Sequence, residues 1–275
     1  MIVLGGSSRQ ALVALRGALD EQLKGASSAE CTALSSDLFK ALGALSSSTG
    51  LRRALTDPAR DHASKVALIN DLFSKEINAK ALALLSSAAS SRWSSSGEIA
   101  DSLEQIAVEA EATAANQENT LDAVEAELFT FSRLLIAHND LRLALNDRAD
   151  SLDRKNELVK SIFASKSAPS TLRLIQALVG GLRGRSIEAA LSAYTHAVSA
   201  RRNRLVAVVR SVVALTPAQE SKLAASLTKQ IGQPVHINTE IDPTVLGGIE
   251  VRFADEIIDG TISNRLAEAS RALAV

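Results

Sequence analysis

The stretch Val245-Leu246-Gly247-Gly248-Ile249-Glu250-Val251-Arg252, with Ile257-Ile258-Asp259-Gly260-Thr261 shortly after it, defines the C-terminal part of this chain. Two short alternating apolar runs flank a polar segment at residues 254–256, a pattern that predicts a β-hairpin. The paired glycines permit a backbone conformation that side chains do not tolerate, or a close approach by another segment. A helix is expected after Asp259, because apolar residues then recur at helical spacing: Ile262, Leu266, Ala269 and Leu273.

The residues before this hairpin predict a strand, a helix and a second strand. The segment 205–215 is rich in valine, as is typical of a strand. Thr216-Pro217-Ala218-Gln219 combines a capping residue, a proline at the first helical position and a glutamine at the third. The apolar segment 235–241 predicts the second strand. The order strand–helix–strand–strand–strand–helix predicts a small α/β domain over residues 205–275.

The rest of the chain contains an internal repeat. The sequence aligns with itself without a gap at a shift of 90 residues (128 − 38). Chance matching in a chain rich in alanine, leucine and serine would not readily place several less common residue types in one ungapped frame. The identical pairs include Leu38-Phe39 with Leu128-Phe129, Asp57 with Asp147, Lys65 with Lys155, and Phe73 with Phe163.

Each copy predicts the same order of helices. In the first copy these are a helix at 29–47, a short turn at 51–55, and helices at 61–73, at 79–91 and from 96 onward. In the second copy they are a helix at 121–137, a short turn at 141–145, and helices at 152–163, at 169–182 and from 186 onward. Leu68 and Phe73, or Leu158 and Phe163, are expected to face inward. An additional N-terminal helix is expected, with Ser7 as cap, Gln10 at the capping-box position and an apolar stripe of Leu12, Leu15, Leu19 and Leu23. Whether the second copy also uses the long helix at 98–115 is left open.

The predicted fold is therefore mainly α, with two tandem helical-bundle modules followed by the small α/β domain. The first module spans residues 1–115 and the second spans residues 116–204. At 275 residues and 46% apolar content the chain can build such cores. Aromatic residues are only 3%, so leucine, alanine, valine and isoleucine must fill them.

Composition also excludes several classes of function. A net charge of −1 argues against a nucleic-acid partner, for which a basic surplus is expected. No apolar run approaches the roughly 20 residues that span a bilayer, and the segment 1–5 is too short for the core of a signal peptide. Cys31 is the single cysteine, so no internal disulfide is expected, as suits a reducing cytoplasm.

No motif predicts catalysis, a cofactor or a metal. The sequence has neither a glycine loop ending in Gly-Lys-Ser/Thr nor a His-Glu-x-x-His motif. The serine-rich segment 94–97 is interpreted as a helix connector, because it lacks the strand and helix that flank a nucleophile. The histidines are far apart in the sequence and are expected at the surface or in loops: His62, His138, His196 and His236.

The remaining polar and aromatic candidates have structural interpretations. Asp57 and Asp147 precede helices and are expected to cap free backbone N–H groups rather than to act as general acids or bases. Trp93 is expected to pack. One basic cluster occurs, and a phosphate site there is possible, although a solvated face or an acidic protein partner is favoured. Its members are Arg183, Arg185, Arg201, Arg202 and Arg204.

The ordered C-terminal residues resemble the signature of the δ subunit of bacterial F-type ATP synthases, a relative of the mitochondrial oligomycin-sensitivity-conferring protein. Thr261 stands where serine is usual. The second helical module resembles the helical domain of this family through Leu145-Asn146-Asp147, Lys155 and Phe163. The usual member has one such module, whereas two are typical of the long actinobacterial form. The signature residues are Asp242, Pro243, Leu246, Gly247, Gly248, Ile258, Asp259, Gly260, Thr261 and Leu266.

The resemblance implies a non-catalytic peripheral-stalk (stator) subunit without a cofactor, at the cytoplasmic face of the plasma membrane. It implies that a helical domain binds N-terminal α-subunit segments of the catalytic head, and that the C-terminal domain holds the ends of the b subunits. A helical-repeat adaptor unrelated to ATP synthase, an enzyme with an unrecognised site, and a role of one helical copy as a spacer remain alternatives. The candidate groove for the α segment consists of Leu172, Leu174, Ile175 and Leu178, or of Leu82, Leu84 and Leu85 in the other copy.

Overall fold

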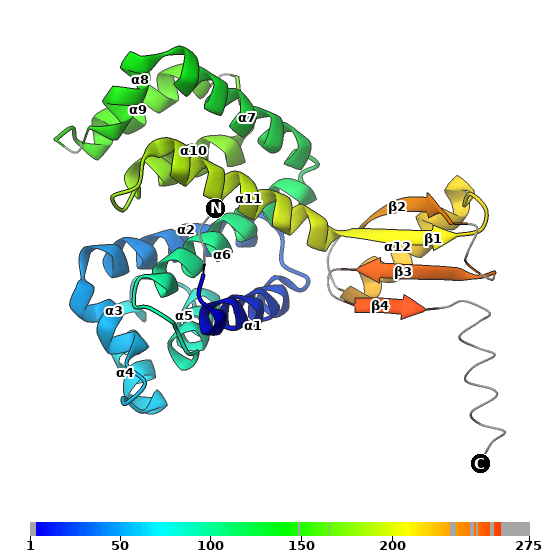
Figure 1. Ribbon diagram of the computed structural model, residues 1–275, viewed down its shortest axis with the longest axis horizontal. Helices are drawn as coiled ribbons and strands as arrows, with labels where there is room; N and C mark the ends of the chain where they lie inside the picture. Colours follow the sequence, from blue (N-terminus) through cyan, green and yellow to red (C-terminus); the bar gives the residue numbers. More distant parts are fainter. Residues whose placement is uncertain are drawn as a thin grey trace. The chain divides into compact units, whose positions relative to one another are not determined.

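The computed structural model describes residues 4–259, except 148, 165, 232–234, 243, 244, 246, 254 and 255. The chain divides into two units, Met1–Ser199 and Ala200–Val275. The first unit is helical, and the second contains a four-stranded sheet (Figure 1). The predicted class, mainly α with a small C-terminal α/β part, is confirmed.

The helical unit contains two runs of helices in the same order. An additional helix, α1 (Gly6–Leu23), precedes the first run. The first run is α2 (Ser28–Ser47), α3 (Thr49–Thr56), α4 (His62–Phe73), α5 (Ala79–Ser90) and α6 (Glu98–Gln117). The second run is α7 (Leu121–Ala137), α8 (Asn139–Asn146), α9 (Leu152–Phe163), α10 (Pro169–Gly180) and α11 (Ile187–Leu205).

The spacing of these helices matches the repeat seen in the sequence. Helix α8 begins 90 residues after α3 (139 − 49), and the same shift relates α9 to α4 and α10 to α5. The prediction of short turns at 51–55 and 141–145 is wrong. These segments lie within the eight-residue helices α3 and α8. Ser48 explains the first of these, because its hydroxyl accepts from the Leu51 N–H at 3.1 Å and caps a new helix directly after α2.

None of the three predicted caps, Ser7, Asp57 and Asp147, is the N-cap of a helix in the structure. Helix α1 begins at Gly6 after an N-cap at Gly5 without a side-chain cap, so the predicted cap at Ser7 is wrong. Asp57 and Asp147 do not cap the helices that follow them. Each carboxylate instead accepts an N–H two residues later, at 2.9 Å, in the turn that leaves α3 or α8. The caps of α4 and α9 are Asp61 and Ser151.

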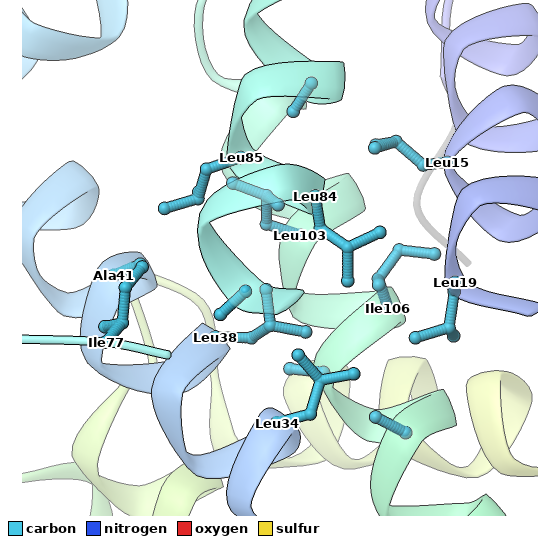
Figure 2. Packing of buried hydrophobic residues seen from close by; sticks show 14 of the residues in the cluster. Leu15, Leu19, Leu34, Leu38, Ala41, Ile77, Leu84, Leu85, Leu103 and Ile106 are labelled. Carbon is cyan, nitrogen blue, oxygen red and sulfur yellow. The ribbon is translucent and has the colours of Figure 1, made fainter. Parts of the chain in front are cut away.

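Among the residues described between 4 and 199, two hydrophobic clusters fill the helical unit. In the first cluster, side chains from α1, α2, α5 and α6 converge, and the predicted stripe of α1 is buried there (Figure 2). In the second cluster, Phe131 and Phe163 pack edge to face with ring centroids 5.4 Å apart. The residues labelled in Figure 2 that show the convergence are Leu15, Leu19, Leu34, Leu38, Leu84, Leu85, Leu103 and Ile106.

Helix α6 belongs to both clusters. Leu103, Ile106 and Ala110 pack in the first cluster, whereas Val108 and Ala112 pack in the second. Helix α6 is buried along nearly its whole length, and its apolar and small residues pack in both clusters. The second copy therefore does use the long helix that follows the first. The predicted boundary between residues 115 and 116 falls near the end of this shared helix.

The C-terminal unit contains a sheet with the strand order β2-β1-β3-β4. Strands β1 and β2 are parallel, β3 is antiparallel to β1 and β4, and helix α12 connects β1 to β2. The core comprises Ala207, Val209, Leu227, Val235 and Val251. The bounds are β1 (Val206–Ser211), α12 (Pro217–Ile231), β2 (His236–Ile241), β3 (Ile249–Phe253) and β4 (Glu256–Asp259).

The turns of this unit confirm two features of the sequence. Thr216 and Gln219 form the predicted capping box, with the Thr216 N–H 2.9 Å from Gln219 Oε1 and the Gln219 N–H 3.3 Å from Thr216 Oγ1. Gly247 and Gly248 have φ angles of 69° and 83°, a region that favours glycine. Strand β1 ends at Ser211, earlier than predicted. Outside the described residues lie the predicted final helix and the signature residues Pro243, Leu246, Gly260, Thr261 and Leu266.

Candidate functional site

Three buried glutamates on α6 form ion pairs with arginines from both halves of the helical unit. Glu109 pairs at 2.7 Å with Arg16 of α1, and Glu111 pairs at 2.7 Å with Arg173 of α10. Glu104 pairs at 2.7 Å with Arg185, in the segment between α10 and α11. A buried carboxylate without a partner would cost several kcal/mol, so each arginine fixes the helix or loop that carries it against α6.

The predicted basic cluster is thus not a solvated face. Arg183 pairs with Asp101 at 2.7 Å and also with Glu104, and Arg201 is fully buried. Arg202 is half-buried, and the side chain of Arg204 lies outside the described residues. For Arg183 and Arg185 the acidic partner is α6 of the same chain, about 80 residues earlier. The local sequence therefore could not show it.

An aromatic contact also joins the two copies. The ring of Phe39 on α2 stacks on that of Tyr194 on α11, with centroids 6.2 Å apart and planes inclined by 23°. Tyr194 is buried, and burial raises the pKa of its hydroxyl well above the usual range, with the nearby Glu104 carboxylate adding to the effect. Among the described residues, this hydroxyl has no partner in hydrogen-bonding geometry. The contact between Phe39 and Tyr194 is therefore made by the two rings.

The residues predicted for an α-segment groove lie mostly in the cores. Leu174, Ile175 and Leu178 are buried in the second cluster, and Leu84 and Leu85 are buried in the first. Leu172 and Leu82 are partly buried and are the members that could meet a partner directly. The groove itself stays a prediction.

The described residues of the helical unit form a groove at each of two places on its surface. One, of about 360 Å³, lies between α2 and α10, and its wall includes Phe39, Lys40, Arg173 and the predicted Leu174. The other, of about 530 Å³, lies between α7, α8 and α9 and was not predicted. The second groove is lined by Leu134, His138, Asp140, Leu141, Ala144, Leu158 and Ile162. Most of these are apolar positions of the repeat, and that repetition was the sequence signal that could have indicated the groove.

The other candidates take structural positions. His62, His138 and His196 are exposed, and among the described residues no group of histidine, cysteine and acidic side chains could hold a metal. Trp93 packs on the first cluster and donates its indole N–H to the Ala88 carbonyl at 2.8 Å. The serine-rich segment connects α5 to α6, with the Ser94 N–H donating to Ser8 Oγ at 2.9 Å. Of the helices described, none is both long and apolar enough to cross a membrane.

These features define a duplicated helical-bundle protein with an α/β C-terminal unit and apolar grooves on its helical surface. The chain belongs to the ATP synthase delta (OSCP) subunit family, whose model matches residues 108–273. The resemblance drawn from the C-terminal signature is therefore confirmed. The match begins inside α6, in agreement with the use of this helix by the second copy.

Relatives in actinobacteria match nearly the whole chain. The ATP synthase subunit delta of Streptomyces griseus is 41% identical over 98% of this chain and 100% of its own length. That of Streptomyces coelicolor is 40% identical over 98% of both chains. That of Thermobifida fusca is 36% identical over 98% of this chain and 99% of its own. The additional N-terminal helical copy is thus within the length that these relatives share.

Proposed function

We propose that this chain is a non-catalytic peripheral-stalk subunit of the F-type ATP synthase, which joins the catalytic head to the b subunits and resists the torque of the rotor. The observation that carries the proposal is the family match over residues 108–273, together with relatives named ATP synthase subunit delta that align with nearly the whole chain. The adaptor unrelated to ATP synthase is not favoured, because these matches extend well beyond the C-terminal signature.

The architecture suits a mechanical role. A joint that bears torque needs slow dissociation and little internal movement rather than reactive groups. Helix α6 is packed on all sides and is ion-paired to arginines of both copies, so the helical unit resists shear between its halves. Apolar grooves on a helical surface are suited to amphipathic helices, which insert one apolar face.

The two units take different partners in this proposal. The helical unit binds N-terminal α-subunit segments through its surface grooves, with Leu172 or Leu82 as contacts within the predicted sets. The C-terminal unit binds the ends of the b subunits. Its exposed Val213 and Ile241 supply apolar surface for them. The protein then lies at the cytoplasmic face of the plasma membrane as a peripheral part of the complex.

A reconstitution of the full-length chain with purified catalytic head and soluble b subunits tests this function. We expect size-exclusion chromatography to show one complex that contains all three components, and no head–b complex without this chain. The substitution Leu158→Asp in the α7–α9 groove should weaken head binding and leave b binding unchanged, and Ile241→Asp should do the reverse. If the wild-type chain binds neither component, the stator role is wrong and the adaptor becomes the better hypothesis.

A further inference from the structure

The groove between α2 and α10 lies where the two helical copies meet, and its base is apolar. Phe39 of α2 forms one side of the base, and Leu174 and Ala177 of α10 form the other. Phe39 stacks on Tyr194, and Leu174 is fully buried in the second cluster. The base is therefore fixed by the fold, as is usual in pockets that bind small molecules.

Polar side chains without partners surround this base. The hydroxyls of Thr32 and Ser36 and the amide of Gln176 line the groove. Among the described residues, none of these three side chains is engaged by another residue. Small-molecule pockets combine an apolar base with a few polar groups of this kind, which orient the ligand. The groove has both components.

The accessible charges at the groove are positive. Arg173 pairs through Nε and Nη2 with Glu111, which is 2% exposed, whereas the arginine is 40% exposed. Its Nη1 has no partner among the described residues. Lys40 is 60% exposed, whereas its partner Asp37 is 14% exposed and also accepts the Asn78 N–H. Solvent therefore meets the two cations rather than the two carboxylates.

We propose that this groove binds a small anionic molecule with an aromatic or branched aliphatic body. The body lies on Phe39 and Leu174, and a carboxylate, sulfonate or phosphate group is bound by Arg173 and Lys40 through charge-assisted hydrogen bonds. The groove volume of about 360 Å³ lies in the range of roughly 300–1,000 Å³ that is typical of small-molecule sites. This binding activity is separate from the stator function and does not depend on it.

The site needs both helical copies. One wall is α2, which lies outside the residues 108–273 that the family model matches, and the other wall is α10. The counterpart of Phe39 in the second copy is Phe129 on α7, which exposes 62% of its surface and so is not covered in the same way. A molecule that contacts both walls stabilises the packing of the two copies, because it binds only when they are packed.

A fluorescence titration of the full-length chain with anilinonaphthalenesulfonate tests the proposal. The neutral phenylnaphthylamine carries the same rings without the sulfonate and should bind about tenfold more weakly or worse. Lys40→Gln should weaken binding of the sulfonate roughly threefold to tenfold and leave binding of the neutral probe unchanged. Ser36→Phe, at an exposed position of the groove wall, should weaken binding of both probes at least about tenfold, because the new side chain fills the groove.

Two further variants serve as matched controls. Lys160→Gln removes a lysine that is 49% exposed and lies outside the groove. Leu158→Asp changes the α7–α9 groove. Both should bind the sulfonate as the wild-type chain does, and circular dichroism at 222 nm checks that every variant keeps its helices.

Several results would overturn the proposal. These are no binding of the sulfonate by the wild-type chain, equal affinity for the two probes, wild-type affinity in Ser36→Phe, or loss of binding in Leu158→Asp. All of them leave the stator function intact, because the titration uses the chain alone. Displacement of the bound sulfonate by purified catalytic head would instead make the groove part of the contact with the head, and would also contradict the proposal.

Discussion

Arg16 on α1 donates from Nε to the carboxylate of Glu109 on α6 at 2.7 Å, across 93 positions of sequence. The glutamate side chain is fully buried, and the arginine is mostly so. Two residues further along the same helix, Glu111 pairs with Arg173 of the second copy. The polar interior of the helical unit is therefore organised around one helix.

The first prediction concerns this pair. Glu109→Gln leaves the Arg16 guanidinium buried without a counter-charge and should lower the free energy of unfolding by about 3 kcal/mol. The control is Glu157→Gln, which breaks the exposed 2.9 Å pair with Lys160 and should cost less than about 1 kcal/mol. Urea unfolding followed by circular dichroism at 222 nm measures both. Equal effects of the two substitutions would contradict the view that the buried pair of Glu109 and Arg16 stabilises the fold more than an exposed pair does.

The second prediction separates the ring of Tyr194 from its hydroxyl. Tyr194→Phe keeps the stack on Phe39 and removes a buried hydroxyl that lacks a hydrogen-bond partner among the described residues, so stability at neutral pH should be unchanged or raised by up to about 1 kcal/mol. Tyr194→Ala removes the ring and should cost about 3–5 kcal/mol. A large loss in the phenylalanine variant, measured by the same denaturation, would show that the hydroxyl has a structural partner after all.

The third prediction is a loss of stability at alkaline pH. The unfolded tyrosine titrates near pH 10, whereas burial, aided by the Glu104 carboxylate, raises the pKa of Tyr194 in the folded protein. Below pH 10 both states keep the proton. Above it the unfolded state loses the proton and the folded state retains it, so stability falls by up to about 1.4 kcal/mol per pH unit. This part of the pH dependence should vanish in Tyr194→Phe.

Tyr194 is the only tyrosine, so its ionisation can be followed directly by absorbance at 295 nm. We expect tyrosinate to appear together with the loss of helical signal. Its appearance while the protein is still fully helical would mean that Tyr194 is accessible to solvent in the folded state.

The fourth prediction follows from the sharing of α6. Trp93, the single tryptophan, packs on the first cluster, and Tyr194 lies in the second. Because both clusters lose core residues if α6 unfolds, the two copies should unfold together. Denaturation followed by Trp93 fluorescence and by absorbance of Tyr194 should give coincident transitions. Two separated midpoints would instead support independent modules at residues 1–115 and 116–204.

The fifth prediction concerns the paired glycines. Gly248 has a φ angle of 83°, so Gly248→Ala should destabilise the C-terminal unit by about 1–2 kcal/mol and leave the helical unit unchanged. Gly25→Ala, at a φ angle of 67° after α1, is the matched control for the other unit. Amide hydrogen exchange in the strands measures how far each substitution destabilises the C-terminal unit. Unchanged protection in β3 of the Gly248 variant would show that the turn adapts at little cost.

Local and periodic features of the fold could be predicted from the sequence. The 90-residue shift related the two runs of helices, and the capping box at Thr216 placed the start of α12. These succeed because turn and cap chemistry acts over three or four residues. Helices α3 and α8 were missed, because such short helices have too few turns to show an apolar period.

The sequence by itself determined the duplication, the helical class and the C-terminal signature, since each is a pattern of residue types at fixed spacing along the chain. The tertiary structure alone decided that α6 serves both copies, that Arg183 and Arg185 pair inward, and that Phe39 is covered while Phe129 is exposed. The physical reason is that burial and ion pairing depend on segments about 80 to 150 residues apart in the chain. Two residues at the same position of a repeat acquire different environments once one copy packs on the other.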